Sequence, residues 1–150
     1  MKVAIVTDST AYIPAEVSRG HMIRTAPLQV IWGSETFQDG INITPDEFYK
    51  RLSTAKVMPT TSQPSPAVFI EIYEQLSREG YDILSLHISA KLSGTIDSAT
   101  QAKAALPKIN LEVVDSYSTS MALGFQVMAV VRAAAQGATL QECKSMAEQA

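Results

Sequence analysis

A strand-to-helix turn near the middle of the chain is the most informative stretch of the sequence. From residue 85 the letters run SLHISAKLSGTIDSAT, in which a short apolar run is followed by small polar residues and an alanine-rich helical pattern. Ser93, Gly94 and Thr95 would stand at the start of that helix. Such a turn directs backbone N–H groups, hydroxyls and the positive end of a helix dipole toward one place. The stretch therefore predicts an anion-binding site.

Short apolar runs alternate with helical patterns along much of the chain, which is typical of α/β proteins. The runs at residues 2–6, 82–88 and 111–114 predict buried strands of a mainly parallel sheet with helices on both faces. The expected fold is a three-layer α/β/α arrangement. Hydroxyl or carboxylate side chains follow each run, and the carboxyl ends of parallel strands meet at one edge of a sheet. The residues at these ends are Asp8, Ser9, the stretch from Ser89 to Thr95, Asp115 and Ser116.

One segment departs from this alternation. Apolar and β-branched residues on either side of Gly33 and Ser34 predict a β-hairpin excursion near residues 28–37. After it, Thr44 followed by Pro45 and two acids has the pattern of a helix start. The chain then returns to the strand–helix alternation. Residues 121–135 predict a mostly apolar helix that should be buried between layers or domains. A capping box at residues 139–142 predicts the start of a last helix, which should run to Ala150.

Residues 56–65 are the least regular part of the sequence, because Pro59, Pro64 and the following Pro66 restrict them to extended and turn geometry. Several uncharged hydrogen-bonding side chains stand between these prolines. They suit either a preorganised recognition loop or a linker that caps the next helix. Ser65 before Pro66 fits an N-cap, whereas Thr61 and Ser62 are compatible with both roles. Turn and helix-cap chemistry likewise explains Asp8 and Ser9 as well as a site does.

Composition excludes several classes of function. The chain has 150 residues and a net charge of −3, which suits one domain and gives no basic face for nucleic acid. Its single cysteine, Cys143, and two histidines, His21 and His87, provide no disulfide framework and no structural metal site. No apolar run approaches the ~20 residues of a membrane span, and the first residues open directly into a strand. We therefore expect a cytoplasmic protein without a cofactor.

The common catalytic motifs are absent from the sequence. It contains no nucleophile elbow, no nucleotide phosphate loop and no dinucleotide fingerprint. Ser93, His87 and Asp115 could be combined as a triad, so a small-molecule hydrolase or phosphotransferase using Ser93 and Asp115 stays an alternative. His87 on a strand is more often a half-buried structural histidine. Hydroxyls with helix N–H groups hold a carboxylate or phosphate well and react with it poorly.

A series of short motifs appears in a characteristic order. They are Val6-Thr7-Asp8-Ser9-Thr10, Pro14, Pro27-Leu28, Asp39-Gly40, Thr61-Ser62-Gln63-Pro64-Ser65, Leu92-Ser93-Gly94-Thr95 with Ser98-Ala99, and Asp115-Ser116. Together they resemble the DegV family of fatty-acid-binding proteins. The Thr-Ser-Gln-Pro-Ser and Leu-Ser-Gly-Thr motifs are specific in combination.

The resemblance implies a protein that holds one long-chain fatty acid, such as palmitate, in an apolar tunnel between two domains. By analogy, Thr61 and Ser93 would hydrogen-bond the carboxylate. The surrounding rim would then be formed by Ser62, Gly94, Thr95, Asp8, Ser9, Asp115 and Ser116. Family members are partners of an ATP-dependent fatty-acid kinase, which phosphorylates the carboxylate so that the acyl phosphate reaches phospholipid synthesis. A chain of this kind would itself be no enzyme and carry no nucleotide site.

Two departures from the family pattern bear on these expectations. DegV-like proteins are nearly twice as long, so we expect residues 1–150 to be an N-terminal lipid-head-group-binding domain whose C-terminal domain is absent. Such a domain alone would bind fatty acid weakly or not at all. Where the family often has a glycine-rich turn after Ser116, this sequence keeps only Gly124.

Two further interpretations stay open. The tunnel wall could include Ile96, Val127, Met128 and Val131, although core packing explains these residues as well. A domain that only docks a kinase is a third functional hypothesis.

Overall fold

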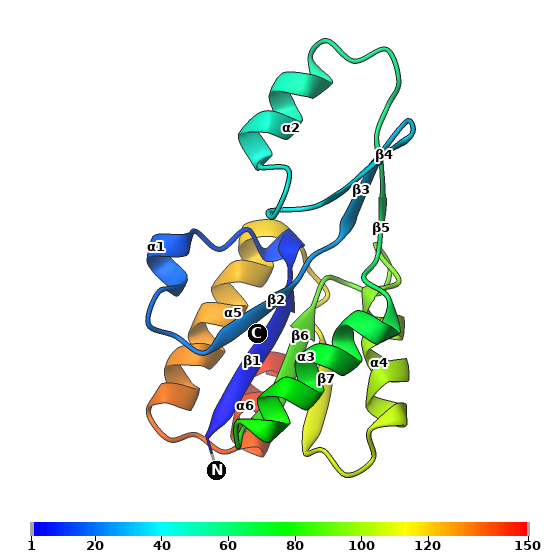
Figure 1. Ribbon diagram of the computed structural model, residues 1–150. Coiled ribbons are helices and arrows are strands. Elements are labelled where there is room, and N and C mark those ends of the chain that lie inside the picture. The colour runs from blue at the N-terminus through cyan, green and yellow to red at the C-terminus, as the bar shows by residue number, and fades with distance from the viewer. Residues whose placement is uncertain (1, 150) are drawn as a thin grey trace.

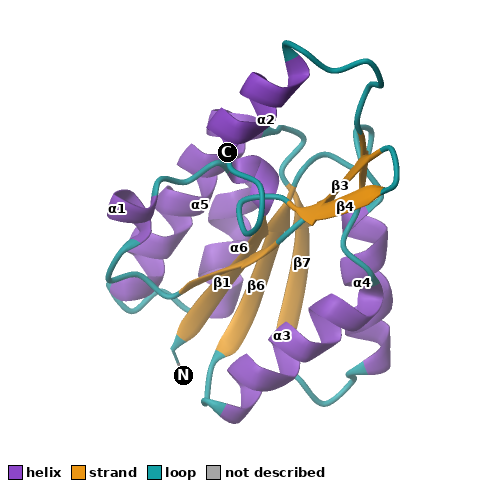
Figure 2. Ribbon diagram, turned by 45° about the horizontal axis from the view of Figure 1, so that its top comes forward, coloured by secondary structure: helices purple, strands orange, loops and turns teal. Residues whose placement is uncertain are grey.

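The computed structural model describes residues 2–149, which form a parallel sheet between two layers of helices (Figures 1 and 2). The four strands lie in the order β2-β1-β6-β7, and all neighbouring pairs are parallel. Their bounds are β1 Val3–Asp8, β2 Ile23–Ala26, β6 Asp82–His87 and β7 Leu111–Asp115. The three-layer α/β/α fold predicted from the sequence is confirmed.

Helices cover both faces of this sheet. One face is covered by α3 (Pro66–Arg78) and α4 (Thr95–Ala105), and the other by α5 (Ser120–Ala135) and α6 (Leu140–Gln149). Strand β1 is buried along its whole length because its apolar side chains alternate between the two layers. Ile5 lies in the core with α5 and α6, and Val6 lies in the core with α3 and α4. The edge strand β2 is covered less well, since the segment before it forms only the short elements η1 (Ser9–Ala11) and α1 (Ala15–Ser18).

A smaller antiparallel sheet projects beyond the carboxyl edge of the parallel sheet, at the top of Figure 1. It contains β3 (Gln29–Trp32), β4 (Glu35–Gln38) and β5 (Thr60–Ser62) in the order β4-β3-β5. Helix α2 (Pro45–Leu52) packs on it around Trp32 and Phe48, whose ring centroids are 5.4 Å apart. The predicted hairpin excursion is confirmed.

The structure of residues 56–65 differs from the prediction that this proline-rich segment is irregular. Residues 60–62 form strand β5, whose backbone pairs with β3 in antiparallel register. The three residues of β5 are all Thr or Ser and show no apolar pattern. The strand therefore forms only because it pairs with β3, which is distant in sequence. Strand β2 of the parallel sheet has no predicted counterpart either, because it has only four residues and is only partly buried.

The predicted helix starts are confirmed at three places. Thr44 and Glu47 form a reciprocal capping box at α2, and the Ser65 hydroxyl accepts a hydrogen bond from the Val68 amide at α3. The amide of Glu142 donates to the Thr139 hydroxyl before α6. We predicted that the last helix reaches Ala150, but that residue lies outside the described range.

Helix α5 was expected to be buried between layers or domains because it is apolar on most sides. The structure buries one side of it, including Val127 and Val131, against the parallel sheet. Phe125 on the opposite side is 68% exposed. Within residues 2–149, no helix has the length and hydropathy needed to cross a membrane.

Candidate ligand-binding site

The two motifs singled out in the sequence meet beyond the carboxyl edge of the parallel sheet. Thr61 and Ser62 belong to β5, and Gln63 begins the connection to α3. Gly94 precedes the first residue of α4. A Cβ atom at Gly94 would stand 2.9 Å from the Gln63 Nε2 atom, so the Gln63 amide lies directly against this glycine. Segments about thirty residues apart in sequence thus form one surface.

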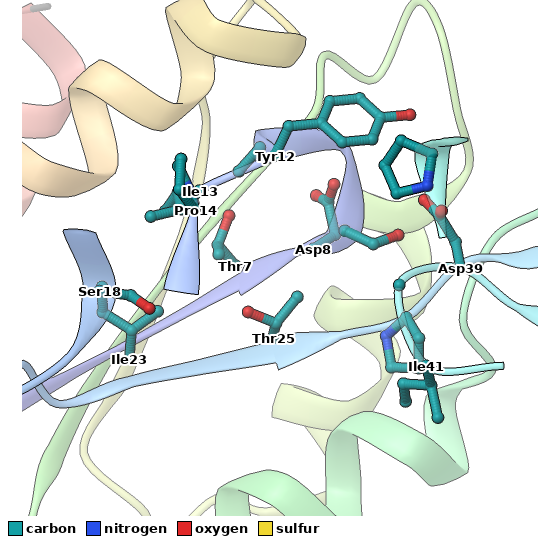
Figure 3. A pocket seen from close by; sticks show the side chains of 15 residues that line it. Thr7, Asp8, Tyr12, Ile13, Pro14, Ser18, Ile23, Thr25, Asp39 and Ile41 are labelled. Atoms are coloured by element: carbon teal, nitrogen blue, oxygen red, sulfur yellow. The ribbon is translucent and has the colours of Figure 1, made fainter. Parts of the chain in front are cut away.

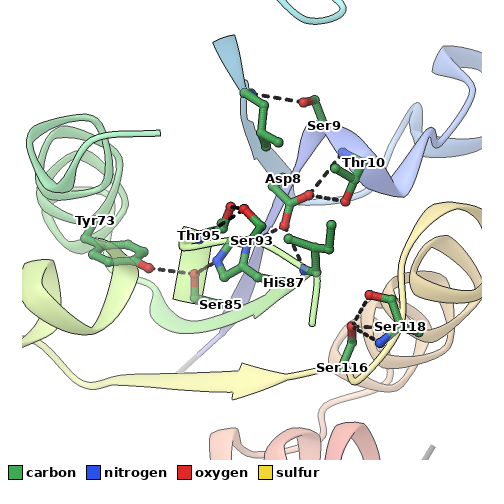
Figure 4. Close-up of polar contacts among 12 residues, drawn as sticks. Asp8, Ser9, Thr10, Tyr73, Ser85, His87, Ser93, Thr95, Ser116 and Ser118 are labelled. Carbon is green, nitrogen blue, oxygen red and sulfur yellow. Dashed lines mark hydrogen bonds and ion pairs between the residues drawn. The ribbon is translucent and has the colours of Figure 1, made fainter. Parts of the chain in front are cut away.

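Ser93 is held by a compact set of hydrogen bonds at the start of α4 (Figure 4). Its hydroxyl lies 2.9 Å from the Thr95 hydroxyl and accepts a hydrogen bond of 3.3 Å from the Thr95 amide. The Ser93 amide donates to the Ser89 carbonyl. Thr95 is fully buried, whereas Ser93 keeps partial exposure. The hydroxyl is therefore fixed in position at a helix N-terminus, where a negative charge is favoured.

Thr61 is exposed and lies opposite Val30 in the antiparallel register of β3 and β5. Side chains alternate along a strand, so Thr60 points to the other face of this small sheet. The Ser62 hydroxyl donates weakly to the Gln63 carbonyl, at 3.4 Å. The Thr61 side chain makes no hydrogen bond to another described residue. Its hydroxyl can therefore donate to a ligand.

A buried chain of polar side chains, which the sequence did not reveal, lies between α3 and the strands β6 and β1 beneath this surface. It runs from the Tyr73 hydroxyl through the Ser85 hydroxyl to His87 Nε2, and from His87 Nδ1 to the Asp8 carboxylate (Figure 4). The distances from Tyr73 to Ser85 and from His87 to Asp8 are 2.6 Å and 3.0 Å. All four side chains are fully buried, including His87, which we had expected to be half-buried. The only sequence signal was polar residues inside apolar runs.

The Asp8 carboxylate joins the ends of two strands. One oxygen accepts a 3.0 Å hydrogen bond from the Ile88 amide just after β6, and the other accepts from the amide and hydroxyl of Thr10. Burial would raise the pKa of Asp8. The hydrogen bond and charge of His87, with the donors of Thr10 and Ile88, outweigh burial and lower that pKa.

The other residues predicted for the rim also tie loops together. Asp115 accepts hydrogen bonds from the amides of Ala90 and Tyr117, at 3.2 Å and 2.8 Å. The Ser116 hydroxyl is bonded to Ser118, whose carbonyl accepts from the Ser89 amide. These contacts bring the three strand ends together at one edge, as the parallel sheet requires.

Ser9 lies on the outer side of this edge. Its hydroxyl accepts a 3.0 Å hydrogen bond from the Leu28 amide. Ser9 therefore connects the end of β1 to the start of the small sheet.

The geometry disfavours a catalytic triad made of Ser93, His87 and Asp115. Both ring nitrogens of His87 are occupied, one by Ser85 and one by Asp8. No hydrogen bond among the described residues joins His87 to Ser93. Ser85, His87 and Asp8 do have the order of a triad, but all three are fully buried and the Ser85 hydroxyl also bonds to Tyr73. This arrangement suits a structural network.

The comparisons with known proteins identify the family. The family model described as "Uncharacterised protein, DegV family" matches residues 2–150. The chain belongs to the DegV family. A DegV domain-containing protein of Streptomyces coelicolor is 41% identical over 147 residues, and protein DegV of Bacillus subtilis is 35% identical over 142 residues. The matches cover 97% and 95% of this chain but 52% and 50% of those proteins. The chain thus spans about half the length of these curated relatives.

Solved DegV structures have the same fold. A structure described as DegV, a fatty acid binding protein from Bacillus subtilis, matches with a TM-score of 0.90 and 34% identity. A structure described as showing fatty acid binding of a DegV family protein from Thermus thermophilus matches with a TM-score of 0.89 and 34% identity. Each match covers 99% of this chain and 53% of the other. The DegV fold is therefore shown along nearly the whole chain.

Proposed function

We propose that this DegV-family chain contributes the head-group half of a fatty-acid-binding site. In this proposal the Thr61 and Ser93 hydroxyls donate to the carboxylate, and the first turn of α4 favours its charge. The observation that carries the proposal is the contact of Gln63 with Gly94, because it fixes the Thr61 segment against the Ser93 turn. Relatives from Bacillus subtilis and Thermus thermophilus are described as fatty-acid binding, which supports the same ligand.

The remaining rim residues have a supporting role in this proposal. Asp8, Asp115 and Ser116 hold the loops that carry the hydroxyls, and Ser9 ties them to the small sheet. Ser62, Gly94 and Thr95 flank the two donors and leave room for a carboxylate. With hydroxyl and amide donors, and with His87 occupied elsewhere, the site would bind the carboxylate without attacking it.

In this proposal a second domain covers the acyl tail, since the relatives are about twice as long as this chain. Four apolar side chains near the same edge support this: Leu92, Tyr117, Met121 and Phe125 are between 47% and 78% exposed. Covering such side chains with another surface lowers the free energy, because it removes apolar area from water. Ile96, Val127, Met128 and Val131 were candidate wall residues. The latter three are buried in this chain, so core packing accounts for them, and Ile96 is half-buried.

We further propose that the bound carboxylate is presented to an ATP-dependent fatty-acid kinase and that the acyl phosphate then enters phospholipid synthesis. The chain would be the lipid-carrying subunit and the kinase would supply the nucleotide site. An exposed head-group edge with fixed donors is compatible with transfer to a partner. This step extends the binding proposal and depends on it.

Co-purified lipid tests the binding proposal. The 150-residue chain and a fusion to the remaining half of Bacillus subtilis DegV would be purified from cells, and bound fatty acid measured by mass spectrometry. We expect near-stoichiometric fatty acid in the fusion and little in the chain alone. Thr61→Ala with Ser93→Ala should remove most of it, whereas the matched control Thr60→Ala on the opposite face should not.

Full occupancy in the double variant would overturn the head-group assignment. Lipid bound equally well by the 150-residue chain alone would overturn the second-domain proposal and leave the head-group proposal standing.

A further inference from the structure

A pocket beside the edge strand β2 lies apart from the two proposed carboxylate donors, although Asp8 and Ser9 of the supporting rim are among its lining residues. Its volume is about 460 Å³, within the range of pockets that hold small molecules. It lies between η1, α1, the strands β1 and β2, and the turn at Asp39 and Gly40 (Figure 3). Neither Thr61 nor Ser93 lines it.

The pocket follows from how the edge of the sheet is covered. Ile23 and Thr25 of β2 pair with Ile5 and Thr7 of β1, so these side chains share the face of the sheet that α5 covers over β1. Over β2 the one-turn helix α1 and the chain around Ile13 form the cover on that side of the pocket. A single turn covers less surface than the full helices on the rest of the sheet, and a hollow remains.

One buried polar group in the pocket lacks a partner. Thr7 is fully buried and lines the pocket, and its hydroxyl has no hydrogen bond within the described residues. Figure 3 shows this hydroxyl among the lining side chains, directed toward the side formed by Tyr12 and Ile13. Leaving a buried hydroxyl unpaired is costly, and valine would fill the same volume without that cost. A ligand that reaches Thr7 would satisfy it.

The charge of the pocket decides the class of ligand. Asp8 and Asp39 are among its lining residues, and none of its described lining residues is a Lys, Arg or His. Burial and the nearby charge of Asp8 raise the pKa of Asp39, and a hydrogen bond from Ser9 partly offsets them. Carboxylates would be repelled from this cavity, whereas hydrogen-bond donors would be attracted. Much of the remaining wall is apolar, including Ala11, Ile13 and Ile23.

We propose that this pocket is a second ligand site, which takes a small molecule with a hydroxyl or protonated amine on an apolar body and excludes carboxylates. The donor head group bonds to Thr7 and to the carboxylate of Asp39. The apolar body lies against Ala11, Ile13 and Ile23. The site therefore differs in charge preference from the proposed fatty-acid carboxylate site.

Three probes with the same six-carbon body test this preference: 1-hexanol, hexylamine and hexanoate. Each would be titrated into the uniformly ¹⁵N-labelled 150-residue chain while amide chemical shifts are recorded. We expect 1-hexanol or hexylamine, or both, to shift the amides of residues 11–14, 25 and 39–41 in a saturable way. Hexanoate should leave these amides unchanged. Shifts in this group caused by hexanoate as strongly as by the other two would overturn the proposal, as would no saturable shift from any probe.

Thr7→Val tests the contact with the unpaired hydroxyl. The variant should weaken binding of the best probe about three- to tenfold, the effect of one lost hydrogen bond. The same substitution at the exposed Thr36 of β4, outside the pocket, should leave the dissociation constant unchanged. Because Thr7→Val removes an unpaired polar group, the free protein should unfold at an equal or higher urea concentration. Unchanged probe affinity in a folded Thr7→Val protein would overturn the role of Thr7.

Discussion

At the scale of single residues, the fully buried carboxylate of Asp8 accepts hydrogen bonds from four donor atoms. The structure places its carboxylate between His87, the Ile88 amide and Thr10. A buried carboxylate is stable only when hydrogen bonds and opposite charge replace the water it has lost. Asp8 was predicted as a ligand-site candidate from its place at a strand end, and the structure gives it internal partners.

Asp8→Asn should destabilise the chain by about 1–3 kcal/mol at neutral pH, because the amide cannot accept from every donor that the carboxylate satisfies. The pKa of Asp8 is lower in the folded chain than its ordinary value of 3.8. Its ionised form therefore adds stability above that value, which is lost as the pH falls through the folded-state pKa. Urea unfolding between pH 7 and pH 2.5 should show a weaker loss of stability in acid for Asp8→Asn than for the parent chain. Exposed Asp46→Asn is the control, and parallel curves for Asp8→Asn and the parent would contradict this account.

The turn between β7 and α5 stores backbone strain in two non-glycine residues. Tyr117 and Ser120 have φ angles of 55° and 57°, in the left-handed region that favours glycine. The backbone thus takes glycine-like conformations at the place where the resemblance led us to expect a glycine-rich turn.

Ser120→Gly should raise the free energy of unfolding by about 0.5–1 kcal/mol, because relief of strain exceeds the entropy that glycine loses. Thr119→Gly is the matched control. Its φ of −151° is extended, so glycine there should only destabilise. Equal effects of the two substitutions in urea unfolding would rule out stored strain at Ser120.

At the scale of elements, Gly124 sets how closely α5 approaches the segment after β1. A Cβ atom there would stand 2.7 Å from the Ala11 carbonyl oxygen, which is backbone and cannot swing away. Gly124→Ala should therefore destabilise the chain by about 1–3 kcal/mol despite the higher helix propensity of alanine. Ala122→Gly, on the exposed side of the same helix, should cost about 1 kcal/mol from propensity alone. If Gly124→Ala instead raised the thermal unfolding temperature, α5 would be able to move away from the Ala11 segment at no cost, contrary to this account.

The contact of Gln63 with Gly94 joins the small sheet to the turn before α4. A methyl group at position 94 would meet the end of a flexible side chain, so Gly94→Ala should change the free energy of unfolding by less than about 0.5 kcal/mol. It should still displace Gln63 and reduce co-purified fatty acid in the two-domain fusion. In a Gln63→Ala background the same substitution should have little further effect on lipid content. Additive losses in the double variant would mean that the contact does not link the two motifs.

The sequence was sufficient for the elements whose pattern is local. Apolar runs predicted β1, β6 and β7, the Gly33-Ser34 turn predicted the hairpin, and hydroxyl residues before prolines predicted the starts of α2 and α3. It was insufficient for β2 and β5, which are short, partly polar and exist through pairing with β1 and β3. The network from Tyr73 to Asp8 was missed for the same reason, since the register of β1 and β6 decides which polar residues meet. The contact of Gln63 with Gly94 likewise needed the fold.

At the scale of the whole molecule, the chain forms about half of what its DegV relatives contain, and the proposed head-group edge lies where apolar side chains are exposed. A fatty acid whose carboxylate is held at this edge would direct its tail toward the proposed second domain. The parallel sheet fixes the loops, and the small sheet brings Thr61 to them. In the proposed complex, this chain orients the fatty acid through its carboxylate, and the second domain buries most of the tail, at about 0.8 kcal/mol for each buried methylene.

The most direct test of this account is the ¹³C resonance of carboxyl-labelled palmitate in the two-domain fusion, followed as a function of pH. Hydrogen bonds from Thr61 and Ser93 to the ionised form should lower the carboxylate's pKa below that of free palmitate under the same conditions. In Thr61→Ala with Ser93→Ala, the bound resonance should disappear or titrate like the free acid, whereas Thr60→Ala should leave it unchanged. A bound carboxylate with the same lowered pKa in the double variant would contradict the assignment of these two hydroxyls.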